Sequence, residues 1–471
     1  MSLASAALPD MESPHLKRLL FTLALPAMIG LSANAMHQLA NAYFVSQLGT
    51  NAIAAVSICF PLLIIFSAIG EGAGIGVASS VARMLGAGQQ QQANRSASTV
   101  MLLLGVAGCV LAAVLVPLLS TLLRAMGSSA DALPASTVYA TIFCLSAPLI
   151  LLQMLCDFIA ISEGNSRFSM WTLLGSFALN VILDPILIFH YEMGVAGAAW
   201  ATLLSALAAL IAYAFYFYLG IGKIEVAPRH IKIERQALWQ VVSIGVPAAM
   251  STGLAALAFA LIYRNAATYG NAAVAAVAIS LRILTGGSLP LVGFCLGAQA
   301  LLGFAWGGGQ HARFLQATRL MLAISSAFAI SYAATVIVFA PRIVSWFTSD
   351  TEVQALAVSA CRAFHLCFGL FGFHMVAVVA LQAAERSGKA AWLVLAPHGY
   401  LLIPLLFLLP PVWGLDGLLA SMAIAAGLSA ALGGLLLLWE MPSLRQLPAV
   451  QVEVVVPTKA AAFDLPVQAK H

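Results

Sequence analysis

Charged residues are scarce in this sequence. Asp, Glu, Lys and Arg make up 8% of the 471 residues, whereas 62% are hydrophobic. A water-soluble chain carries about a quarter charged residues, so this composition excludes water as the main solvent of the chain. Runs of about 20 apolar residues are instead typical of helices that span a lipid bilayer.

The sequence also lacks the motifs of soluble enzymes and of metal centres. It contains no Walker A, HExxH or GxSxG motif, which argues against ATP hydrolysis, zinc proteolysis and serine-hydrolase chemistry. Its seven cysteines lie in or beside apolar stretches and form no CxxC pair, so we interpret them as small buried residues. We therefore expect a protein that is not an enzyme and has no cofactor and no metal.

Apolar stretches long enough to cross a bilayer follow one another along most of the chain. We predict an all-α integral membrane protein with spans at residues 19–42, 52–80, 96–123, 134–161, 169–190, 194–219, 237–263, 272–303, 314–340, 354–384, 390–411 and 415–439. The polar segments 1–18 and 440–471 flank these spans, and the longest central polar loop, 220–236, separates the first six from the last six.

The two halves repeat each other. A shift of 221 residues places Pro26 on Pro247, Gly49 on Gly270, and the segment 86–89 on 307–310. A duplicated six-helix unit is typical of secondary transporters, in which the substrate path lies between the repeats. We therefore predict an N-lobe (19–219), an inter-lobe linker (220–236) and a C-lobe (237–439), with a polar tail after residue 440.

The basic residues indicate the orientation in the membrane. Of the 21 Lys and Arg residues, sixteen fall on the side of the two termini, three fall on the opposite side and two fall within spans. Basic loops stay in the cytoplasm, so we expect both termini there. No basic run precedes the first span, so we expect no cleavable signal. The net charge of +4 reflects this loop bias and does not indicate nucleic-acid binding.

Polar side chains inside the spans are the candidate functional residues, because charges at membrane depth are costly and usually functional. They form stripes at helical spacing on the first, fourth, fifth and sixth spans. The candidates for a proton-coupling or cation network are Asp184, Asn180, Asn41, Thr202 and Asp157. The candidates for the substrate cavity or its gating are Asn34, Gln38, Tyr139, Gln153, Glu71 and Arg282. Their simplest alternative role is to hold packed helices together by hydrogen bonds.

Asp184 is the strongest candidate, because an ionised carboxylate at membrane depth needs a cation or a proton as its partner. Glu71 fits equally well as a packing residue of the lobe interface, Asp157 lies near the terminal side of its span, and Arg282 is either a counter-charge or a cavity residue. The histidines at 37, 365, 374 and 398 fit best as hydrogen-bonded bundle residues. Pro26 interrupts the first span as a kink or a hinge.

Three segments resemble one known family. The stretch 43–50, the turn 163–165, and the segment 180–185 together with 194–202 are similar to motifs of the multidrug and toxic compound extrusion transporters, in particular the bacterial DNA-damage-inducible-F-like branch. The resemblance covers roughly residues 15 to 440. It implies a V-shaped, two-lobed transporter of the bacterial inner membrane that exports amphipathic, often cationic compounds in exchange for protons or sodium by alternating access. By the same motifs, Asn180, Asp184 and Thr202 belong to the coupling network.

Two details bear on coupling. The other branch of the family places acids in its seventh and tenth helices, and here the spans 237–263 and 354–384 contain none, which favours proton coupling in the N-lobe. Eight residues before Gly49 the family pattern has an aspartate, where this chain has Asn41; this is either a natural variant that couples through Asp184 or a deliberate substitution. We expect a monomer that carries organic cations. A flippase of lipids or lipid-linked precursors, a sodium-coupled antiporter and a receptor remain alternatives.

Overall fold

The computed structural model describes residues 9–128 and 130–446, and this part of the chain is helical without a strand. The N-lobe contains the helices α1 (Leu16–Ser46), α2 (Thr50–Ile58), α3 (Phe60–Gly86), α4 (Gln90–Ala125), α5 (Leu133–Ser162), α6 (Ser166–Pro185), η2 (Ile186–His190) and α7 (Val195–Tyr218). The short helix η3 (Pro228–His230) lies in the linker. The C-lobe contains α8 (Arg235–Ala267), α9 (Asn271–Gly307), α10 (His311–Ser345), α11 (Thr351–Leu366), η4 (Phe368–Leu370), α12 (Phe371–Ala383), α13 (Ser387–Leu395), α14 (Leu402–Leu408) and α15 (Pro410–Gln446).

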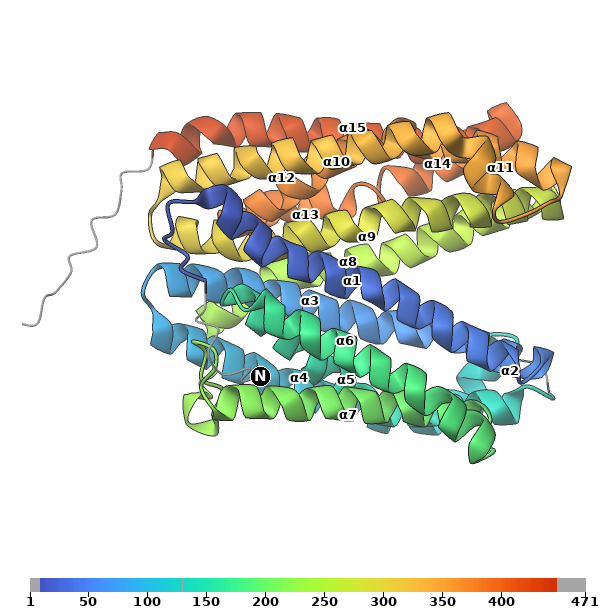
Figure 1. The fold of residues 1–471 in the computed structure, drawn as a ribbon, viewed down its shortest axis with the longest axis horizontal. Coiled ribbons are helices and arrows are strands. Elements are labelled where there is room, and N and C mark those ends of the chain that lie inside the picture. Colours follow the sequence, from blue (N-terminus) through green and yellow to red (C-terminus); the bar gives the residue numbers. More distant parts are fainter. Residues whose placement is uncertain (1–8, 129, 447–471) are drawn as a thin grey trace, which may run out of the picture.

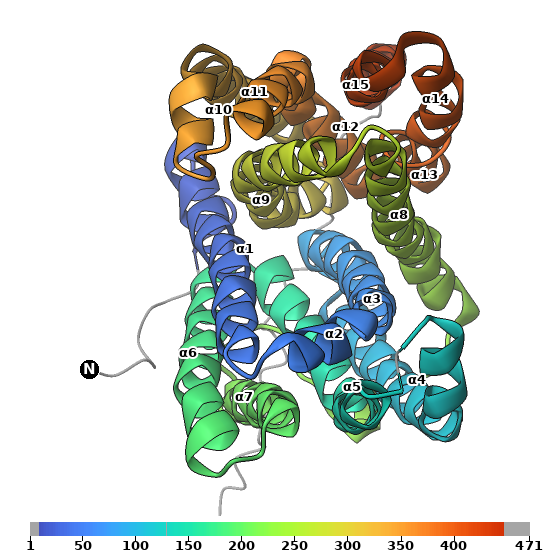
Figure 2. The same cartoon turned by 90° about the vertical axis from the view of Figure 1, so that its right-hand side faces the viewer.

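The two lobes form a V. They meet at the end of the bundle where α1 begins and α15 ends, here called the terminal end, and they separate at the other, open end (Figure 1). Helices α1 and α3 of the N-lobe pack against α8 and α9 of the C-lobe, and the view along the bundle places these four helices between the lobes (Figure 2). This arrangement confirms the predicted two-lobed, V-shaped fold.

The predicted eleventh span, 390–411, is wrong as a single helix. The described residues contain eleven helices long and apolar enough to cross a membrane, and 390–411 is not among them. It is divided into α13 and α14 by the segment 396–401. Pro397 lacks a backbone N–H and disfavours a helical conformation of the residue before it, which favours a break of the helix at this point.

The internal repeat is visible in the backbone. Gly194 before α7 has φ 56° and ψ −133°, and Gly414 within α15 has φ 61° and ψ −138°. Both are in the left-handed region, which only glycine adopts without strain. Two residues 220 apart therefore start the last membrane helix of each lobe in the same way. Of the predicted polar tail 440–471, residues 440–446 continue α15 and 447–471 lie outside the described residues.

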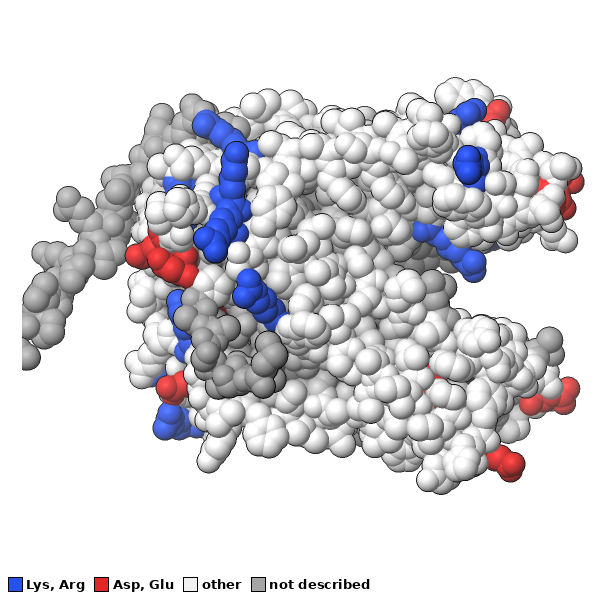
Figure 3. Space-filling model, viewed as in Figure 1, with Lys and Arg blue, Asp and Glu red and all other residues white. Residues whose placement is uncertain are grey.

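Charged side chains lie toward the two ends of the molecule. On the face shown in Figure 3, Lys and Arg gather mainly at the terminal end, and the broad middle of each lobe is uncharged. Apolar side chains such as Trp171, Phe215, Ile330 and Trp392 are exposed on the outside of the helices. This exposure is expected where lipid replaces water as the solvent, so the chain is a multi-span membrane protein.

Candidate coupling site

Asp184 is buried in the half of the N-lobe nearest the open end. It lies on the last turn of α6, immediately before Pro185 and the π-helical turn η2. Pro185 has no N–H to donate to the carbonyl four residues earlier, so the regular helix ends here, and π-turns within helices are frequent at functional sites. Asp184 has no exposed surface, and its Oδ1 has no hydrogen-bond partner. A carboxylate in this position can exchange a proton or face a cation.

Asn180 connects Asp184 to neighbouring helices. When its amide is oriented so that both ends find partners, the nitrogen lies 3.2 Å from Asp184 Oδ2 and 2.8 Å from His37 Nε2, and the oxygen accepts from the backbone N–H of Thr202 at 3.1 Å. In the opposite orientation the oxygen faces His37 Nε2 at 2.8 Å and the nitrogen lies 3.5 Å from Thr202 Oγ1. The structure thus brings Asn180, Asp184 and Thr202 together, as the motif implies.

The polar stripe on α1 does not reach across the bundle in the way that helix-joining amides would. Gln38 is exposed and donates to Asn34 of its own helix at 3.4 Å. The Oδ1 atom of Asn41 is buried without a hydrogen-bond partner. Pro26 lies inside a helix that continues from Leu16 to Ser46, so its role as a hinge stays a prediction. The amide oxygen of Asn41 can therefore accept a further hydrogen bond.

Two α5 residues lie on the inner side of the N-lobe. Tyr139 and Gln153 are buried, and the Tyr139 ring is stacked on Phe143 with a centroid separation of 6.4 Å. The Tyr139 hydroxyl also interacts electrostatically with Asp184. Tyr139 of α5 therefore lies near Asp184.

Asp157, which the sequence assigns to the same coupling network as Asp184, belongs to a separate hydrogen-bonded cluster. Its Oδ1 accepts hydrogen bonds from Ser169 at 3.1 Å and from the Tyr213 hydroxyl. Ser169 and Asp184 are fifteen residues apart on the same helical axis, which corresponds to about 22 Å at 1.5 Å per residue. The cluster therefore joins α5, α6 and α7 near the terminal end, away from Asp184.

Two polar contacts tie the lobes together. Thr252 of α8 donates to Glu71 Oε2 of α3 at 3.0 Å, which places Glu71 at the lobe interface. Arg83, expected in a loop on the terminal side, is instead buried in the last turn of α3. Its guanidinium donates to the Gln382 carbonyl at 3.1 Å and pairs with Glu385 at 3.2 Å. These contacts hold α3 against α8 and α12 in the present state.

Arg282 is an exposed cation on α9, and none of the ion pairs among the described residues includes it. Neighbouring α9 residues are packed on both flanks, Leu281 in one apolar cluster and Ile283 in another. Arg282 interacts electrostatically with Tyr263 of α8. Figure 2 shows the helix α9 on the side of the C-lobe that faces the N-lobe.

The linker is fastened to the N-lobe. Glu163, at the end of α5, accepts from the Tyr216 hydroxyl and from the backbone N–H groups of Lys223 and Ile224. Burial raises the pKa of Glu163 to about 7, although these hydrogen bonds oppose the shift.

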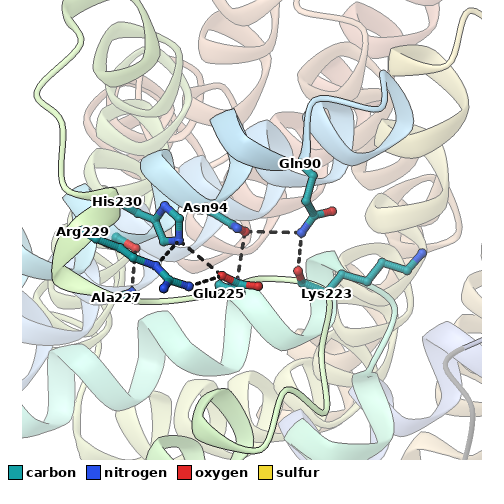
Figure 4. A network of polar contacts seen from close by, with 8 residues as sticks. Gln90, Asn94, Lys223, Glu225, Ala227, Arg229 and His230 are labelled. Carbon is teal, nitrogen blue, oxygen red and sulfur yellow. Dashed lines mark hydrogen bonds and ion pairs between the residues drawn. The ribbon is translucent and has the colours of Figure 1, made fainter. Parts of the chain in front are cut away.

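Further along the linker, Asn94 of α4 accepts from the backbone N–H of Glu225 at 3.0 Å, and Gln90 donates to the Lys223 carbonyl (Figure 4). Arg229 and His230 contact the Glu225 side chain, and the hydrogen bonds from Arg229 and His230 lower the pKa of Glu225. The linker is consequently attached to the N-lobe through α4, α5 and α7.

Sequence reasoning missed three contact residues. His37 was expected to be an ordinary bundle residue, yet it contacts Asn180 and is stacked on Phe177. Its spacing, three residues after Asn34 and four before Asn41, places it on the polar face and would have identified it. Nothing in the sequence pairs Thr252 with Glu71 or Arg83 with Gln382. Within the described part of the chain, no group of three His, Cys, Asp or Glu residues could hold a metal ion.

Comparisons with known proteins agree with this fold. The multidrug export protein MepA of Staphylococcus aureus (strain MSSA476) is 27% identical over 421 residues, which is 89% of this chain and 92% of MepA. MepA of Staphylococcus haemolyticus (strain JCSC1435) is 27% identical over 423 residues, which is 89% of this chain and 93% of that protein.

Solved structures have the same fold. An outward-facing multidrug resistance MATE transporter of the MOP superfamily superposes with a TM-score of 0.86 at 25% identity, covering 91% of this chain and 97% of that one. A MOP-superfamily transporter from Pyrococcus furiosus superposes with a TM-score of 0.85 at 24% identity, covering 92% and 97%. The family model MatE matches residues 26–186 and 247–407, two segments related by the 221-residue repeat. This chain belongs to the MatE family of membrane transporters.

Proposed function

We propose that the chain is a secondary active exporter that exchanges amphipathic, cationic compounds for protons by alternating access. The observation that carries the proposal is the buried Asp184 carboxylate, which has one oxygen bonded to Asn180 and the other unpartnered. Multidrug export by the relatives supports the same type of cargo. The protein acts as a monomer in the bacterial inner membrane, with both termini in the cytoplasm.

The cycle follows from competition at Asp184. An ionised Asp184 attracts a cationic compound, and a proton that neutralises Asp184 removes this attraction and releases the compound outside. Inward movement of one proton through a potential of 100 mV supplies roughly 2.3 kcal/mol, which offsets the cost of moving one monovalent cation outward against the same potential. One-for-one exchange is therefore driven by the pH gradient, at about 1.4 kcal/mol per pH unit. Because the V is closed at the terminal end and open at the other, the present state suits release toward the outside.

The test is efflux of a cationic dye from proteoliposomes in which the pH and sodium gradients are imposed separately. A pH gradient alone should drive transport. A sodium gradient alone, at equal pH on both sides, should not, because helices α8 and α12 carry no acidic residue and the only acid of α11, Glu352, lies in its exposed first turn. Robust sodium-driven efflux without a pH gradient overturns the choice of ion.

A flippase of lipids or lipid-linked precursors is the second candidate. The single observation that favours it is Arg282, an exposed cation of α9 without an ion pair among the described residues, which suits a phosphate group. The same vesicles can be loaded with a fluorescent phospholipid. Translocation of this lipid that depends on Arg282, together with absence of dye efflux, would replace the drug exporter by the flippase.

A further inference from the structure

His37 lies where a second titratable group of the site would be expected. It is on α1, one helical turn before Asn41, and its Nε2 lies 2.8 Å from the side-chain amide of Asn180 on α6. The imidazole is stacked on Phe177 with a centroid separation of 4.7 Å and an angle of 11° between the rings. Stacking and hydrogen bonding together fix the ring so that Nε2 faces Asn180.

The Asn180 amide can form hydrogen bonds with His37 and Asp184 at the same time only in some of their protonation states. A neutral His37 with a free Nε2 lone pair accepts from the amide nitrogen, which then also lies 3.2 Å from Asp184 Oδ2. A His37 protonated at Nε2 must donate, so the amide has to present its oxygen to the ring. In that orientation the amide nitrogen lies near Thr202 Oγ1 at 3.5 Å, and Asp184 loses its donor.

We propose that His37 carries a proton of the transport cycle and that the Asn180 amide couples the protonation of His37 to that of Asp184. This inference rests on the proton-coupled function proposed above. One proton binds to Nε2 of the neutral imidazole and gives an imidazolium, and the amide turns its oxygen toward it. Loss of the amide donor favours the protonated form of Asp184, whereas the positive charge of the imidazolium favours its ionised form. The two groups therefore exchange their protons as a coupled pair.

The position of Asn41 makes this second group necessary. An amide at 41 cannot release a proton, and its Oδ1 has no hydrogen-bond partner. His37 is one turn away on the same face, so it supplies from α1 the titratable group that Asn41 cannot. The site then holds two exchangeable protons, one on α1 and one on α6, and both meet at Asn180.

The charged groups around His37 come from few helices. Helix α6 presents Asp184, α5 presents Tyr139, and α7 presents the uncharged Thr202 at this depth. Helix α2 has no titratable side chain, and the only charged residue of α9 is Arg282. On α10, Arg313 donates to the backbone carbonyls of residues 11 and 12, which precede α1 at the terminal end of the bundle. Asp184 is therefore the charged group coupled to His37 through a shared hydrogen-bond partner.

The experiment counts protons released when a cationic dye binds to the detergent-solubilised full chain, with a pH indicator in weak buffer. The variants are His37→Gln, the double variant His37→Gln/Asn41→Asp, and His190→Gln as the control, because His190 is exposed at the open end. We expect His37→Gln to release one proton fewer per dye than the unmodified chain and to lose the part of the pH dependence that the histidine supplies. The double variant should regain the proton, and His190→Gln should not change the count.

The outcomes distinguish the proposed role of His37 from the proposed proton-coupled export. An unchanged proton count and pH profile in His37→Gln overturn the role of His37 while the proton-coupled function stands. Absence of proton release from the unmodified chain, despite dye binding, overturns the coupled function itself. Folding of each variant is checked by its thermal midpoint. Should His37→Gln fail to fold, ¹⁵N NMR of the His37 ring in the unmodified chain and in Asp184→Asn provides the second measurement. A titration of His37 that shifts with Asp184→Asn supports the coupling, and a ring that does not titrate overturns it.

Discussion

Gly86 of α3 and Gly307 of α9 occupy equivalent positions in the two repeats, and each lies against the backbone of the other's helix. A Cβ atom on Gly86 would lie 2.0 Å from the Phe304 carbonyl oxygen, and one on Gly307 would lie 2.0 Å from the Arg83 carbonyl oxygen. Phe304 and Arg83 are themselves related by the 221-residue repeat. The terminal end of the V is thus closed by a pseudo-symmetric contact that only glycine permits.

Gly86→Val should open this contact. Because the obstacle is backbone, α3 and α9 must separate by about 1 Å or more, and overpacking of this kind costs typically 1–3 kcal/mol. Distances between spin labels at the terminal ends of α3 and α9 should lengthen. Gly175→Ala on α6 is the matched control, since a Cβ there meets no atom within 4 Å. Unchanged label distances in a folded Gly86→Val protein would show that the glycine contact does not hold the lobes together.

Asp157→Asn should leave coupling intact. The variant keeps Oδ1 as an acceptor for Ser169 and Tyr213, whereas Asp157→Ala leaves both hydroxyls unsatisfied and should cost about 1–3 kcal/mol of stability. Thermal midpoints of the two variants measure this difference, and dye efflux at a series of pH values measures coupling. Loss of proton-driven efflux in a well-folded Asp157→Asn protein would return Asp157 to the coupling network.

Asn41→Asp should increase proton-linked efflux and steepen its dependence on pH. The variant adds a carboxylate on the face of α1 that carries His37. Ionisable groups that lie close together share protons, so the added carboxylate should take part in proton exchange. Initial efflux rates at pH 6, 7 and 8 provide the measurement. Equal rates and equal pH profiles in the variant and the unmodified chain would mean that Asn41 is a packing residue.

Glu163 should make the folded protein more stable in mild acid. Because burial raises its pKa to about 7 from 4.5, the stabilising contribution is complete below about pH 4.5 and is lost as the pH rises through 7. The shift is worth on the order of 3 kcal/mol. The thermal midpoint should therefore fall between pH 5 and 8, and by less in Glu163→Gln. Glu225→Gln, an exposed change in the same linker, is the control, and an identical fall in Glu163→Gln and the unmodified chain would refute the contribution.

The spans and the repeat were predictable from sequence because both depend on hydrophobicity and on glycine and proline positions, which act locally. The break in 390–411 was missed although Pro397 is visible in the sequence, because Pro26 and Pro247 show that a membrane helix can also continue through proline. A single proline thus leaves both outcomes open, and packing of the neighbouring helices decides between them.

The candidate site was predictable only within single helices. Helical spacing placed Asn180 and Asp184 on one face of α6, as the structure has them. The assignment of Asp157 to the same network had no such basis, since spacing on α5 says nothing of the distance to α6. The contacts of Glu71 with Thr252 and of Arg83 with Gln382 join residues 181 and 299 positions apart. Such pairs depend on how the lobes close, which no local pattern encodes.

The most direct test of the coupling mechanism is dye efflux driven by a pH gradient alone, compared between the unmodified chain and Asp184→Asn at matched amounts of folded protein. Asn has the size of the protonated acid but cannot release a proton or attract a cation, so we expect dye binding to weaken and gradient-driven efflux to fall to the level of protein-free vesicles. Efflux by Asp184→Asn at the unmodified rate, with the same dependence on the pH gradient, would contradict the claim that Asp184 couples protons to export.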